Sequence, residues 1–354
     1  MNHAIILAGG VGSRFWPLSR ESEPKQFLNI CSDKPMIEET IRRILPLVKK
    51  ENIYIATNKG HNQKIKECQY SLSLPAENFL FEPEGKNTLA PIALLSQKIN
   101  NRDPDAVVVV LPSDHFIKDV KRFVKLLGEG IAISKKGYIV TLGIKTTRPE
   151  TGYGYIRAKV KAKVKVKNKI LRFFKVNKFI EKPTLTKAKK LISDKSYFWN
   201  SGVFIFRANI ILGEIKRLLP TVYKIIMSMN SQRNFNKLWR TLPAISIDYA
   251  IMEKTDKTVV LPADCGWTDL GDWQSLAEFL AGDRCGNIFK GNCLDLESKS
   301  TFVWAGKRLV ATLGLKDIII VDTQDALLVC TKDRTQDIKK IVQLLKQKNI
   351  KGQI

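Results

Sequence analysis

The sequence has few histidines, few acidic residues for its number of basic ones, and no long apolar run. Its three histidines, His3, His61 and His115, do not stand at zinc-ligand spacing with any cysteine. No stretch approaches the ~18 apolar residues that a membrane-spanning helix needs. The N-terminal MNHAIILAGG also lacks the basic leader and cleavage site of a signal peptide. We therefore expect a cytoplasmic protein with no membrane partner.

The cysteines lack any CxxC pair. They are Cys31, Cys68, Cys265, Cys285, Cys293 and Cys330. Scattered cysteines without such spacing indicate free thiols in a reducing compartment.

Basic residues outnumber acidic ones by 59 to 34, which gives a formal net charge of +25. Such a chain attracts anions, so nucleic acid, acidic membrane surfaces and phosphorylated substrates are candidate partners. The densest run, Lys159–Lys169, alternates lysine with valine and alanine. A period of two predicts a strand with one buried face and one solvated lysine face; a nucleic-acid-binding stripe is the alternative. Because no RRM, KH or zinc-finger signature accompanies the run, we expect no nucleic-acid partner.

Residues 1–142 alternate short β-branched runs with stretches of helical spacing. The predicted strands are Ala4–Leu7, Ile53–Ala56, Phe79–Phe81, Ala106–Leu111 and Tyr138–Leu142, and the predicted helices are Glu38–Val48, Thr88–Asn100 and Val120–Ser134. This alternation predicts an α/β fold with a mostly parallel sheet and helices on both faces. Ligands of such sheets bind beyond the carboxyl ends of the strands.

The pattern changes twice after residue 150. A hairpin-like stretch (Tyr155–Phe179) and a strand (Val203–Phe206) suit an elaboration of the same sheet on the substrate side. After Gly286, segments such as CLDLES, TFVWAG and DIIIVDT are separated by turn residues, which predicts an all-β appendix. An amphipathic helix from about Gln336 to Lys348 follows it. We expect a catalytic domain over residues 1–282 and a small C-terminal domain over residues 283–354.

The strongest motif is LAGGVGSRFWPLSRESEPKQFL, residues 7–28. A predicted strand enters a glycine-rich loop whose backbone N–H groups can approach a phosphate closely. The cations Arg14 and Lys25 follow the glycines. Their presence disfavours the alternative that this segment is a tight loop with no ligand. No GK[ST] ends the loop, so it is not a P-loop. Phe15 stands where the dinucleotide fingerprint requires a third glycine.

A second motif is VVVVLPSDH, residues 107–115. Its buried strand ends at Pro112, and Asp114 lies just past the carboxyl end. A doubly wound sheet places ligands there, and a lone carboxylate is a good ligand for Mg²⁺. The alternative is that Ser113 or Asp114 caps a helix.

A third motif, PADCGWTDLGDW, spans residues 262–273. Asp269 offers a second carboxylate for the same ion, because Mg²⁺ usually takes one or two carboxylates and completes its octahedron with phosphate oxygens and water. Asp272 competes for this role, but it also fits the N-cap of a helix beginning near Trp273. We favour Asp269.

Three smaller groups supply polar chemistry. TGYGYI (Thr151–Ile156) gives a flexible backbone near a ligand, and FIEKP supplies Glu181, able to accept sugar hydroxyl protons, and Lys182, able to meet a phosphate. WNSGVF offers Asn200, whose amide can donate to and accept from a polyol. Each group alone is ordinary loop chemistry, but their order and company favour a sugar-phosphate site.

These motifs, in this order, closely resemble the mannose-1-phosphate guanylyltransferase family of sugar nucleotidylyltransferases. The resemblance covers essentially the whole chain, including GNIFKGN and the DRTQDIKKIVQLL helix of the appendix. It implies a Rossmann-like catalytic domain, a short left-handed β-helix and a terminal helix. The usual GWSDVGSW of the family is GWTDLGDW here, which introduces Asp272. Longer members continue into a cupin phosphomannose isomerase domain, so we expect no isomerase activity from these residues.

The resemblance also implies roles for individual residues. Those that would surround the guanine nucleotide are Leu7, Ala8, Gly9, Gly10, Gly12, Ser13, Arg14, Lys25, Glu84, Asn87, Thr88 and Asp114. Those that would hold the sugar phosphate are Gly154, Glu181, Lys182 and Asn200. Arg14, Lys25 and Asp114 would carry catalysis, and Asp114 and Asp269 would hold Mg²⁺.

The expected reaction is in-line attack by a phosphate oxygen of mannose 1-phosphate on the α-phosphorus of GTP, with pyrophosphate leaving. That oxygen is already anionic, so no general base is required, in agreement with the lack of a His or Cys constellation. At ~4 Å, repulsion between two unit charges costs about 4 kcal/mol at an effective dielectric of 20. Mg²⁺, Arg14, Lys25 and Lys182 would offset this repulsion. The alternatives are another sugar 1-phosphate or nucleotide, and a silent nucleotide-sugar-binding regulatory paralogue. A homodimer is a candidate assembly.

Overall fold

The computed structural model describes residues 1–166, 169–229, 232–350 and 352. They form two compact units. The sheet unit comprises Met1–Gly9, Glu38–Ser113 and Ile117–Trp267, and the loop–appendix unit comprises Gly10–Ile37, Asp114–Phe116 and Thr268–Ile354. The chain passes from one unit to the other within each of the three main motifs, after Gly9, Ser113 and Trp267.

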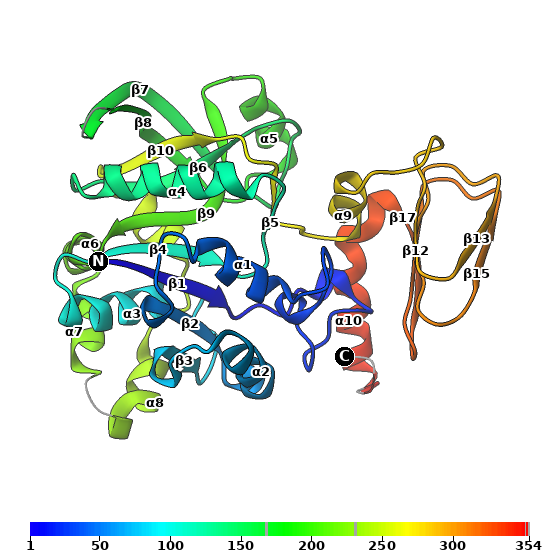
Figure 1. Cartoon of the computed structure of the whole chain (residues 1–354), viewed down its shortest axis with the longest axis horizontal. Coiled ribbons are helices and arrows are strands. Elements are labelled where there is room, and N and C mark those ends of the chain that lie inside the picture. The colour runs from blue at the N-terminus through cyan, green and yellow to red at the C-terminus, as the bar shows by residue number, and fades with distance from the viewer. Residues whose placement is uncertain (167–168, 230–231, 351, 353–354) are drawn as a thin grey trace. The chain divides into compact units, whose positions relative to one another are not determined.

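The sheet unit is built on a nine-stranded sheet of order β3-β2-β1-β4-β9-β6-β10-β8-β7 (Figure 1). Its strands are β1 (Asn2–Ala8), β2 (Ile53–Asn58), β3 (Phe79–Glu82), β4 (Val107–Pro112), β6 (Ile139–Lys145), β7 (Tyr155–Val166), β8 (Lys169–Ile180), β9 (Tyr197–Arg207) and β10 (Thr258–Ala263). β1 pairs in parallel with β2 and β4, β2 with β3, and β6 with β10. β8 and β9 run antiparallel to their neighbours. The predicted mostly parallel sheet is confirmed.

Helices cover both faces of this sheet. They are α1 (Met36–Ile44), α2 (Asn62–Leu72), α3 (Leu89–Arg102), α4 (Val120–Ser134), α5 (Leu185–Ile192), α6 (Ala208–Leu218), α7 (Pro220–Ser228) and α8 (Gln232–Thr241). Ile205 and Phe206 on β9 point to opposite faces, because side chains alternate along a strand. Ile205 packs on α4, where a Cβ added to Gly130 would lie 2.4 Å from Ile205 Cδ1, whereas Phe206 belongs to the core that α3 and α6 share.

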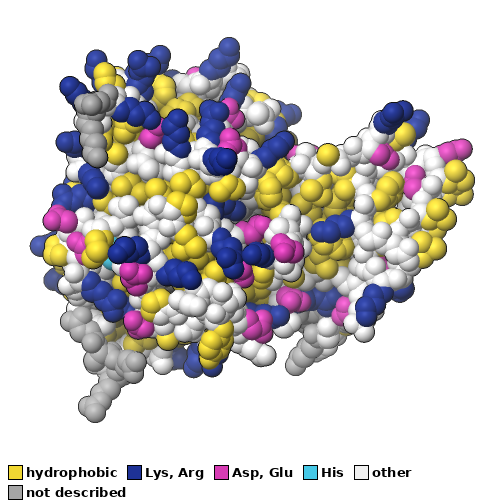
Figure 2. Space-filling view, viewed as in Figure 1, with side chains coloured by type: hydrophobic (Ala, Val, Ile, Leu, Met, Phe, Trp, Pro, Cys, Tyr) yellow, Lys and Arg dark blue, Asp and Glu magenta, His cyan; other side chains and the backbone are white. Residues whose placement is uncertain are grey.

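The lysine-rich run was predicted to be one strand over Lys159–Lys169. Residues 159–166 lie in β7, whose second face is only partly covered, and Lys169 begins β8, whereas residues 167 and 168 lie outside the described residues. Val160 is 52% exposed, and Ala162 and Val164 are half-buried. The physical reason is position: β7 ends the sheet order, and beyond Arg157 its register runs along β8. Figure 2 shows Lys and Arg side chains gathered over the region of this hairpin.

The loop–appendix unit contains the glycine-rich segment and the all-β appendix. Its elements are η1 (Ser13–Phe15), η2 (Lys25–Phe27), α9 (Trp273–Phe279), β12 (Ile288–Lys290), β13 (Cys293–Leu296), β14 (Phe302–Trp304), β15 (Val310–Leu313), β16 (Ile318–Asp322), β17 (Leu327–Thr331), η7 (Lys332–Asp337) and α10 (Ile338–Gln347). β12, β14 and β16 pair in parallel with β17 antiparallel at the edge, and β13 pairs in parallel with β15. Val303, Ala305 and Ile320 form a core against Val310 of the second sheet, giving a β-helix-like domain. The predicted appendix and terminal helix are confirmed.

One hydrophobic core joins the glycine-rich segment to the appendix. Phe15 and Trp16 pack in it with Trp273 of α9 and Phe302 of β14. The centroid of the Trp273 ring lies 4.9 Å from that of Phe15 and 5.7 Å from that of Phe302. The Trp273 Nε1 donates to the Trp16 carbonyl at 3.0 Å. Buried aromatic rings of this size contribute strongly to local stability. The appendix therefore supports the segment that carries Arg14 and Lys25.

Among the described residues, none of the helices combines the length and the apolar character that crossing a bilayer requires. Two short strands, β5 (Phe116–Ile117) and β11 (Trp267–Thr268), span points where the chain changes unit.

Candidate active site

The glycine-rich loop is shaped around Lys25. Gly12 has φ +71°, a left-handed conformation that favours glycine, and a Cβ added to it would lie 2.5 Å from Lys25 Cβ. The Phe15 N–H donates to the Gly12 carbonyl at 2.9 Å, and the Lys25 N–H donates to the Val11 carbonyl at 3.2 Å. Both the backbone conformation and the close approach therefore require glycine at this position.

The Lys25 ammonium joins the three motifs. Its side chain is 4% exposed. Nζ donates to Asp114 Oδ2 at 2.9 Å, to the Asp114 carbonyl at 3.2 Å and to the Asp269 carbonyl at 2.7 Å. Three donors meeting three acceptors fix this ammonium fully. The structure thus brings the segments of Lys25, Asp114 and Asp269 to one point within the loop–appendix unit.

Asp114 lies just beyond β4 and carries a charge suited to a cation. Burial raises the pKa of its carboxyl, but the positive charge of Lys25, together with His115, outweighs burial and holds the pKa below its usual value. The side chain is 36% exposed, so one face of the carboxylate can meet a ligand. The alternative that Ser113 or Asp114 caps a helix is wrong. The N-cap of α4 is Asp119, whose side chain accepts from the Arg122 N–H at 2.9 Å.

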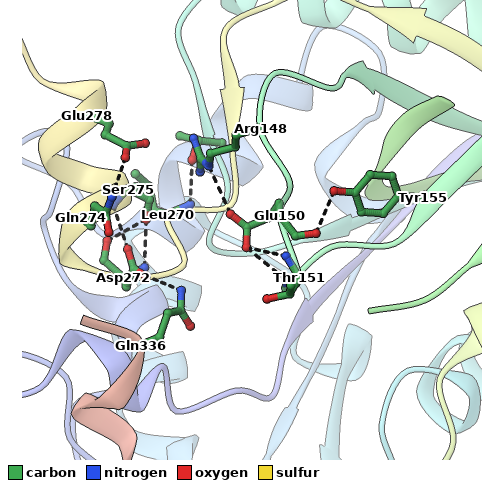
Figure 3. A network of polar contacts seen from close by, with 12 residues as sticks. Arg148, Glu150, Thr151, Tyr155, Leu270, Asp272, Gln274, Ser275, Glu278 and Gln336 are labelled. Atoms are coloured by element: carbon green, nitrogen blue, oxygen red, sulfur yellow. Dashed lines mark hydrogen bonds and ion pairs between the residues drawn. The ribbon is translucent and has the colours of Figure 1, made fainter. Parts of the chain in front are cut away.

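Arg14 and Asp269 flank Gly271. A Cβ added to this glycine would lie 3.2 Å from Asp269 Oδ2 and 3.6 Å from Arg14 Nη1. Asp272 serves as the N-cap of α9 in a capping box, as its position before Trp273 predicted. Its Oδ1 accepts from the Ser275 N–H at 2.8 Å (Figure 3). Because the Asp272 oxygens bind helix and side-chain donors, Asp272 is poorly placed to hold a cation. Asp269 as the second carboxylate stays a prediction.

The donor set fits a hard divalent cation. Asp114 and Asp269 supply carboxylate oxygens from segments that Lys25 holds together. Among the residues described, no group of three or more His, Cys, Asp or Glu side chains is placed to hold a metal. A cation that keeps phosphate and water ligands needs only one or two protein carboxylates, so two suffice here.

In the sheet unit, three predicted sugar-phosphate residues meet. A Cβ added to Gly154 would lie 2.4 Å from Glu181 Oε2 and 3.3 Å from Asn200 Cβ. The Asn200 N–H donates to the Gly154 carbonyl at 2.8 Å. Asn200 lies within β9 and Gly154 directly precedes β7, and β7 and β9 pair at Tyr155 and Trp199. Regular strand pairing therefore positions this group.

The Asn200 amide is oriented by its neighbours. Its Oδ1 accepts from Thr141 Oγ1 at 3.0 Å and from the Gly202 N–H at 3.2 Å, and its Nδ2 donates to Asp248 Oδ1 at 2.9 Å. One N–H of the amide is left to donate to a ligand. The sequence analysis missed Asp248. It begins a π-helical turn, η6 (Asp248–Met252), and such turns are frequent at functional sites.

Glu181 and Asp248 are carboxyl groups in a poorly solvated setting. Burial, with the negative charge of Asp248, raises the pKa of Glu181 to about 7. Burial likewise raises the pKa of Asp248 to about 6. The Nζ of Lys182 lies 3.7 Å from Glu181 Oε1, and the Lys182 side chain is 65% exposed. Perturbed carboxyls of this kind are typical of ligand sites.

A second loop of the sheet unit precedes Gly154. Glu150 Oε1 accepts from the N–H groups of Thr151 and Gly152, both at 3.1 Å, and Glu150 Oε2 meets Arg148 Nε at 3.2 Å. The Tyr155 hydroxyl donates to the Glu150 carbonyl at 2.8 Å (Figure 3). Glu150 therefore orders the TGYG turn. It was not predicted as a site residue, because its only signal in the sequence was its place before that turn.

The predicted nucleotide residues of the sheet unit divide into two groups. Leu7, Ala8 and Gly9 end or follow β1, and a Cβ added to Gly9 would lie 3.8 Å from Glu82 Oε1. Burial raises the pKa of Glu82, at the end of β3, to about 7. Glu84 instead pairs with Lys86 at 2.7 Å.

Asn87 and Thr88 organise their own segment. Asn87 has φ +60° and its Oδ1 accepts from the Thr88 N–H at 2.9 Å. Thr88 Oγ1 accepts from the Ile247 N–H at 2.9 Å, next to Asp248. The structure therefore places Glu82, rather than Glu84, beside the glycine at the end of β1.

Comparison with known proteins identifies the family. The family model for nucleotidyl transferases matches residues 3–284, and that for the MannoseP isomerase/GMP-like beta-helix domain matches residues 291–345. A mannose-1-phosphate guanylyltransferase of Salmonella muenchen is 38% identical over 356 residues, covering 98% of this chain and 73% of the relative. The alginate biosynthesis protein AlgA of Pseudomonas aeruginosa is 36% identical over 346 residues, covering 96% and 71%.

A solved structure matches almost from end to end. It is a Thermus thermophilus protein described as a mannose-1-phosphate geranyltransferase, with a TM-score of 0.87 and 30% identity, and the match covers 98% of this chain and 99% of that one. The structural match and the two family models agree in covering both the catalytic fold and the appendix. The chain therefore belongs to the nucleotidyl transferase family and, within it, to the mannose-1-phosphate guanylyltransferases.

Proposed function

We propose that this chain transfers the guanylyl group of GTP to mannose 1-phosphate, forming GDP-mannose and pyrophosphate. The observation that carries the proposal is the Lys25 ammonium, which gathers the segments of Asp114 and Asp269 beside Arg14. A guanidinium, an ammonium and two carboxylates at a glycine-rich loop suit a reaction of polyphosphates. The reaction and its substrates rest on this arrangement and on the relatives' common activity.

The chemistry needs positioning and charge compensation. A phosphate oxygen of the sugar phosphate attacks the α-phosphorus, the bond to the β-phosphate oxygen breaks, and pyrophosphate leaves with that electron pair. Arg14 binds the triphosphate, while Lys25 adds positive charge and holds the segments of Asp114 and Asp269 together. Lys182, whose side chain is 65% exposed, reaches the sugar phosphate. Mg²⁺ bound by Asp114 and Asp269 would neutralise charge on the transferring phosphate.

Recognition of mannose rests on the group around Asn200. Its one remaining amide N–H donates to a sugar hydroxyl, and the Glu181 carboxylate accepts from another. Gly154 leaves the space in which Glu181 stands. Because these polar groups are pre-oriented, a sugar that lacks a matching hydroxyl leaves them unpaired and binds worse.

Recognition of the base rests on Glu82. Guanine presents an exocyclic amine donor that a carboxylate can accept, whereas adenine presents no such donor at that position. Glu82 lies beside Gly9, since a Cβ added to this glycine would lie 3.8 Å from Glu82 Oε1. Asn87 and Thr88 hold the segment that follows.

The setting in the cell is part of the proposal. All six cysteines are free, and burial raises the thiol pKa of Cys68 to about 12 and of Cys265 to about 11, so these thiols are unreactive. Free thiols suit the reducing cytoplasm. Leu294, Leu296 and Leu313 expose 59–68% of their surface on β13 and β15 and offer an apolar face to a second copy. The predicted homodimer would be checked by light scattering.

A pyrophosphate-release assay tests the function. GTP, ATP and UTP are each combined with mannose 1-phosphate or glucose 1-phosphate, with and without Mg²⁺. We expect release only from GTP with mannose 1-phosphate and Mg²⁺. Release with another sugar phosphate or nucleotide would reassign the substrate. Release without any sugar phosphate would overturn the transfer reaction.

A further inference from the structure

Arg14 meets a side chain from the far end of the chain. Its Nη1 donates to Gln336 Oε1 at 2.7 Å. Gln336 lies in η7, directly before α10, in the C-terminal appendix. Its Nε2 donates in turn to Asp272 Oδ2. The three residues belong to one compact unit and form a chain of hydrogen bonds, whose Gln336–Asp272 link Figure 3 shows.

An amide suits the middle position of this chain. A guanidinium can only donate, and a carboxylate can only accept. The residue between them must therefore accept on one side and donate on the other, which Gln336 does with its oxygen and its nitrogen. Because Arg14 must face the amide oxygen and Asp272 the amide nitrogen, the Gln336 amide has a single orientation.

Asp272 anchors the other end. Its carboxyl is 4% exposed, so an oxygen without a donor would be costly. Oδ1 caps α9 through the Ser275 N–H at 2.8 Å, and Oδ2 receives Gln336. A serine in place of Asp272 could cap the helix but has no second oxygen for the amide. The aspartate therefore makes the link to Gln336.

Further contacts fasten the appendix to the glycine-rich segment. Arg20 binds Asp325 through two hydrogen bonds, from Nη2 to Oδ1 at 2.8 Å and from Nη1 to Oδ2 at 3.1 Å. Lys346 of α10 pairs with Glu21. These contacts hold the turn between β16 and β17, and α10, against the segment that carries Arg14.

We propose that Gln336 is a positioning residue for Arg14, so that the appendix contributes to the triphosphate site. One of five guanidinium N–H donors is held by Gln336, and the others remain for phosphate oxygens. The amide keeps the guanidinium beside Gly271 and Asp269 instead of leaving it to sample many rotamers. This role rests on the proposed use of Arg14 to bind GTP.

The test compares GTP binding by calorimetry with steady-state kinetics. Gln336→Met keeps the length of the side chain but removes both hydrogen bonds. We expect the Kd and KM for GTP to rise about tenfold, the usual effect of losing one hydrogen bond to a charged group, with little change in the KM for mannose 1-phosphate. Arg334→Met, on the same turn and paired with Asp337, is the matched control and should leave both values unchanged.

A double-mutant cycle separates positioning from general support of the fold. Asp272→Ser retains a helix cap but removes the acceptor for Gln336, so Gln336→Met should add little in that background. Full additivity, or unchanged GTP binding by Gln336→Met with an unchanged melting temperature, would overturn the proposal. If the wild type binds GTP but releases no pyrophosphate, the proposed function fails, and the binding cycle still decides the role of Gln336.

Discussion

Glu181 should reduce the stability of the fold at neutral and alkaline pH. Its side chain is 12% exposed, and burial with the charge of Asp248 raises its pKa from 4.5 to about 7. Because the pKa of this carboxyl is raised on folding, its ionisation does not lower the free energy of unfolding well below pH 4.5. The loss of unfolding free energy grows up to about pH 7 and is constant above it. Since one pKa unit corresponds to about 1.4 kcal/mol, the cost reaches up to about 3 kcal/mol. Replacement by the neutral isostere should remove this cost.

The assay is urea denaturation of the wild type and Glu181→Gln at pH 5, 7 and 8.5. The variant should be more stable by up to about 3 kcal/mol at pH 8.5, and the difference should fall to roughly 1 kcal/mol or less at pH 5. The same change removes a charged acceptor for a sugar hydroxyl, so the KM for mannose 1-phosphate should rise by about 10- to 100-fold. A stabilised but impaired enzyme is the signature of a group retained for function.

Two results would refute this reasoning. A difference in stability that does not change with pH would mean that ionisation of Glu181 is not the cause. A variant that is less stable at pH 8.5 would show that the ion pair with Lys182, at 3.7 Å, outweighs burial.

Two other perturbations test the remaining geometry. Gly12→Ala places a Cβ 2.5 Å from Lys25 Cβ at φ +71°, so we expect a loss of about 2 kcal/mol in unfolding free energy and at least a tenfold loss of kcat/KM; near-normal values would contradict the close packing. Hydrogen bonds from Arg217 and Lys257 overcome burial and lower the pKa of Glu214 to about 2. Glu214→Gln should therefore lower the free energy of unfolding by about 2 kcal/mol at pH 7. The difference between the wild type and the variant should shrink as pH falls from 4.5 towards 2. A constant difference would reject this ion pair.

Much of the sheet was predictable because buried parallel strands are continuous β-branched runs. The predicted Val120–Ser134 helix agrees with α4 end to end, and the Val203–Phe206 strand is the buried core of β9. Helix α2 was missed because only Ile65, Cys68 and Leu72 are buried along it, too few to give a clear period. Short apolar signals of this kind do not separate a helix from a loop.

The candidate site was predictable where residues follow strand ends. Lys25 and Asp114 meet because the loop after β1 and the end of β4 leave the same edge of the sheet. Asp248 was missed because SIDYAIMEK reads as an ordinary helical stretch, and its contact with Asn200 spans 48 residues. Gln336 was missed for the same reason, with 322 residues between it and Arg14. The one available signal was the change that introduced Asp272.

The roles assigned to the site residues stay predictions, as do the domain boundary at 282–283 and the left-handed sense of the appendix. The contacts between Glu181, Asn200 and Gly154 show that these motif residues lie together.

In the proposed mechanism, a divalent cation binds directly to Asp114. The most direct measurement is the metal dependence of Asp114→Cys, because a thiolate binds Mg²⁺ poorly but binds softer cations well. With Mg²⁺, the rate of pyrophosphate release should fall by at least a thousandfold, and Mn²⁺ or Cd²⁺ should restore part of it in the variant relative to the wild type. A rate with Mg²⁺ close to that of the wild type, with no change in metal preference, would contradict the account.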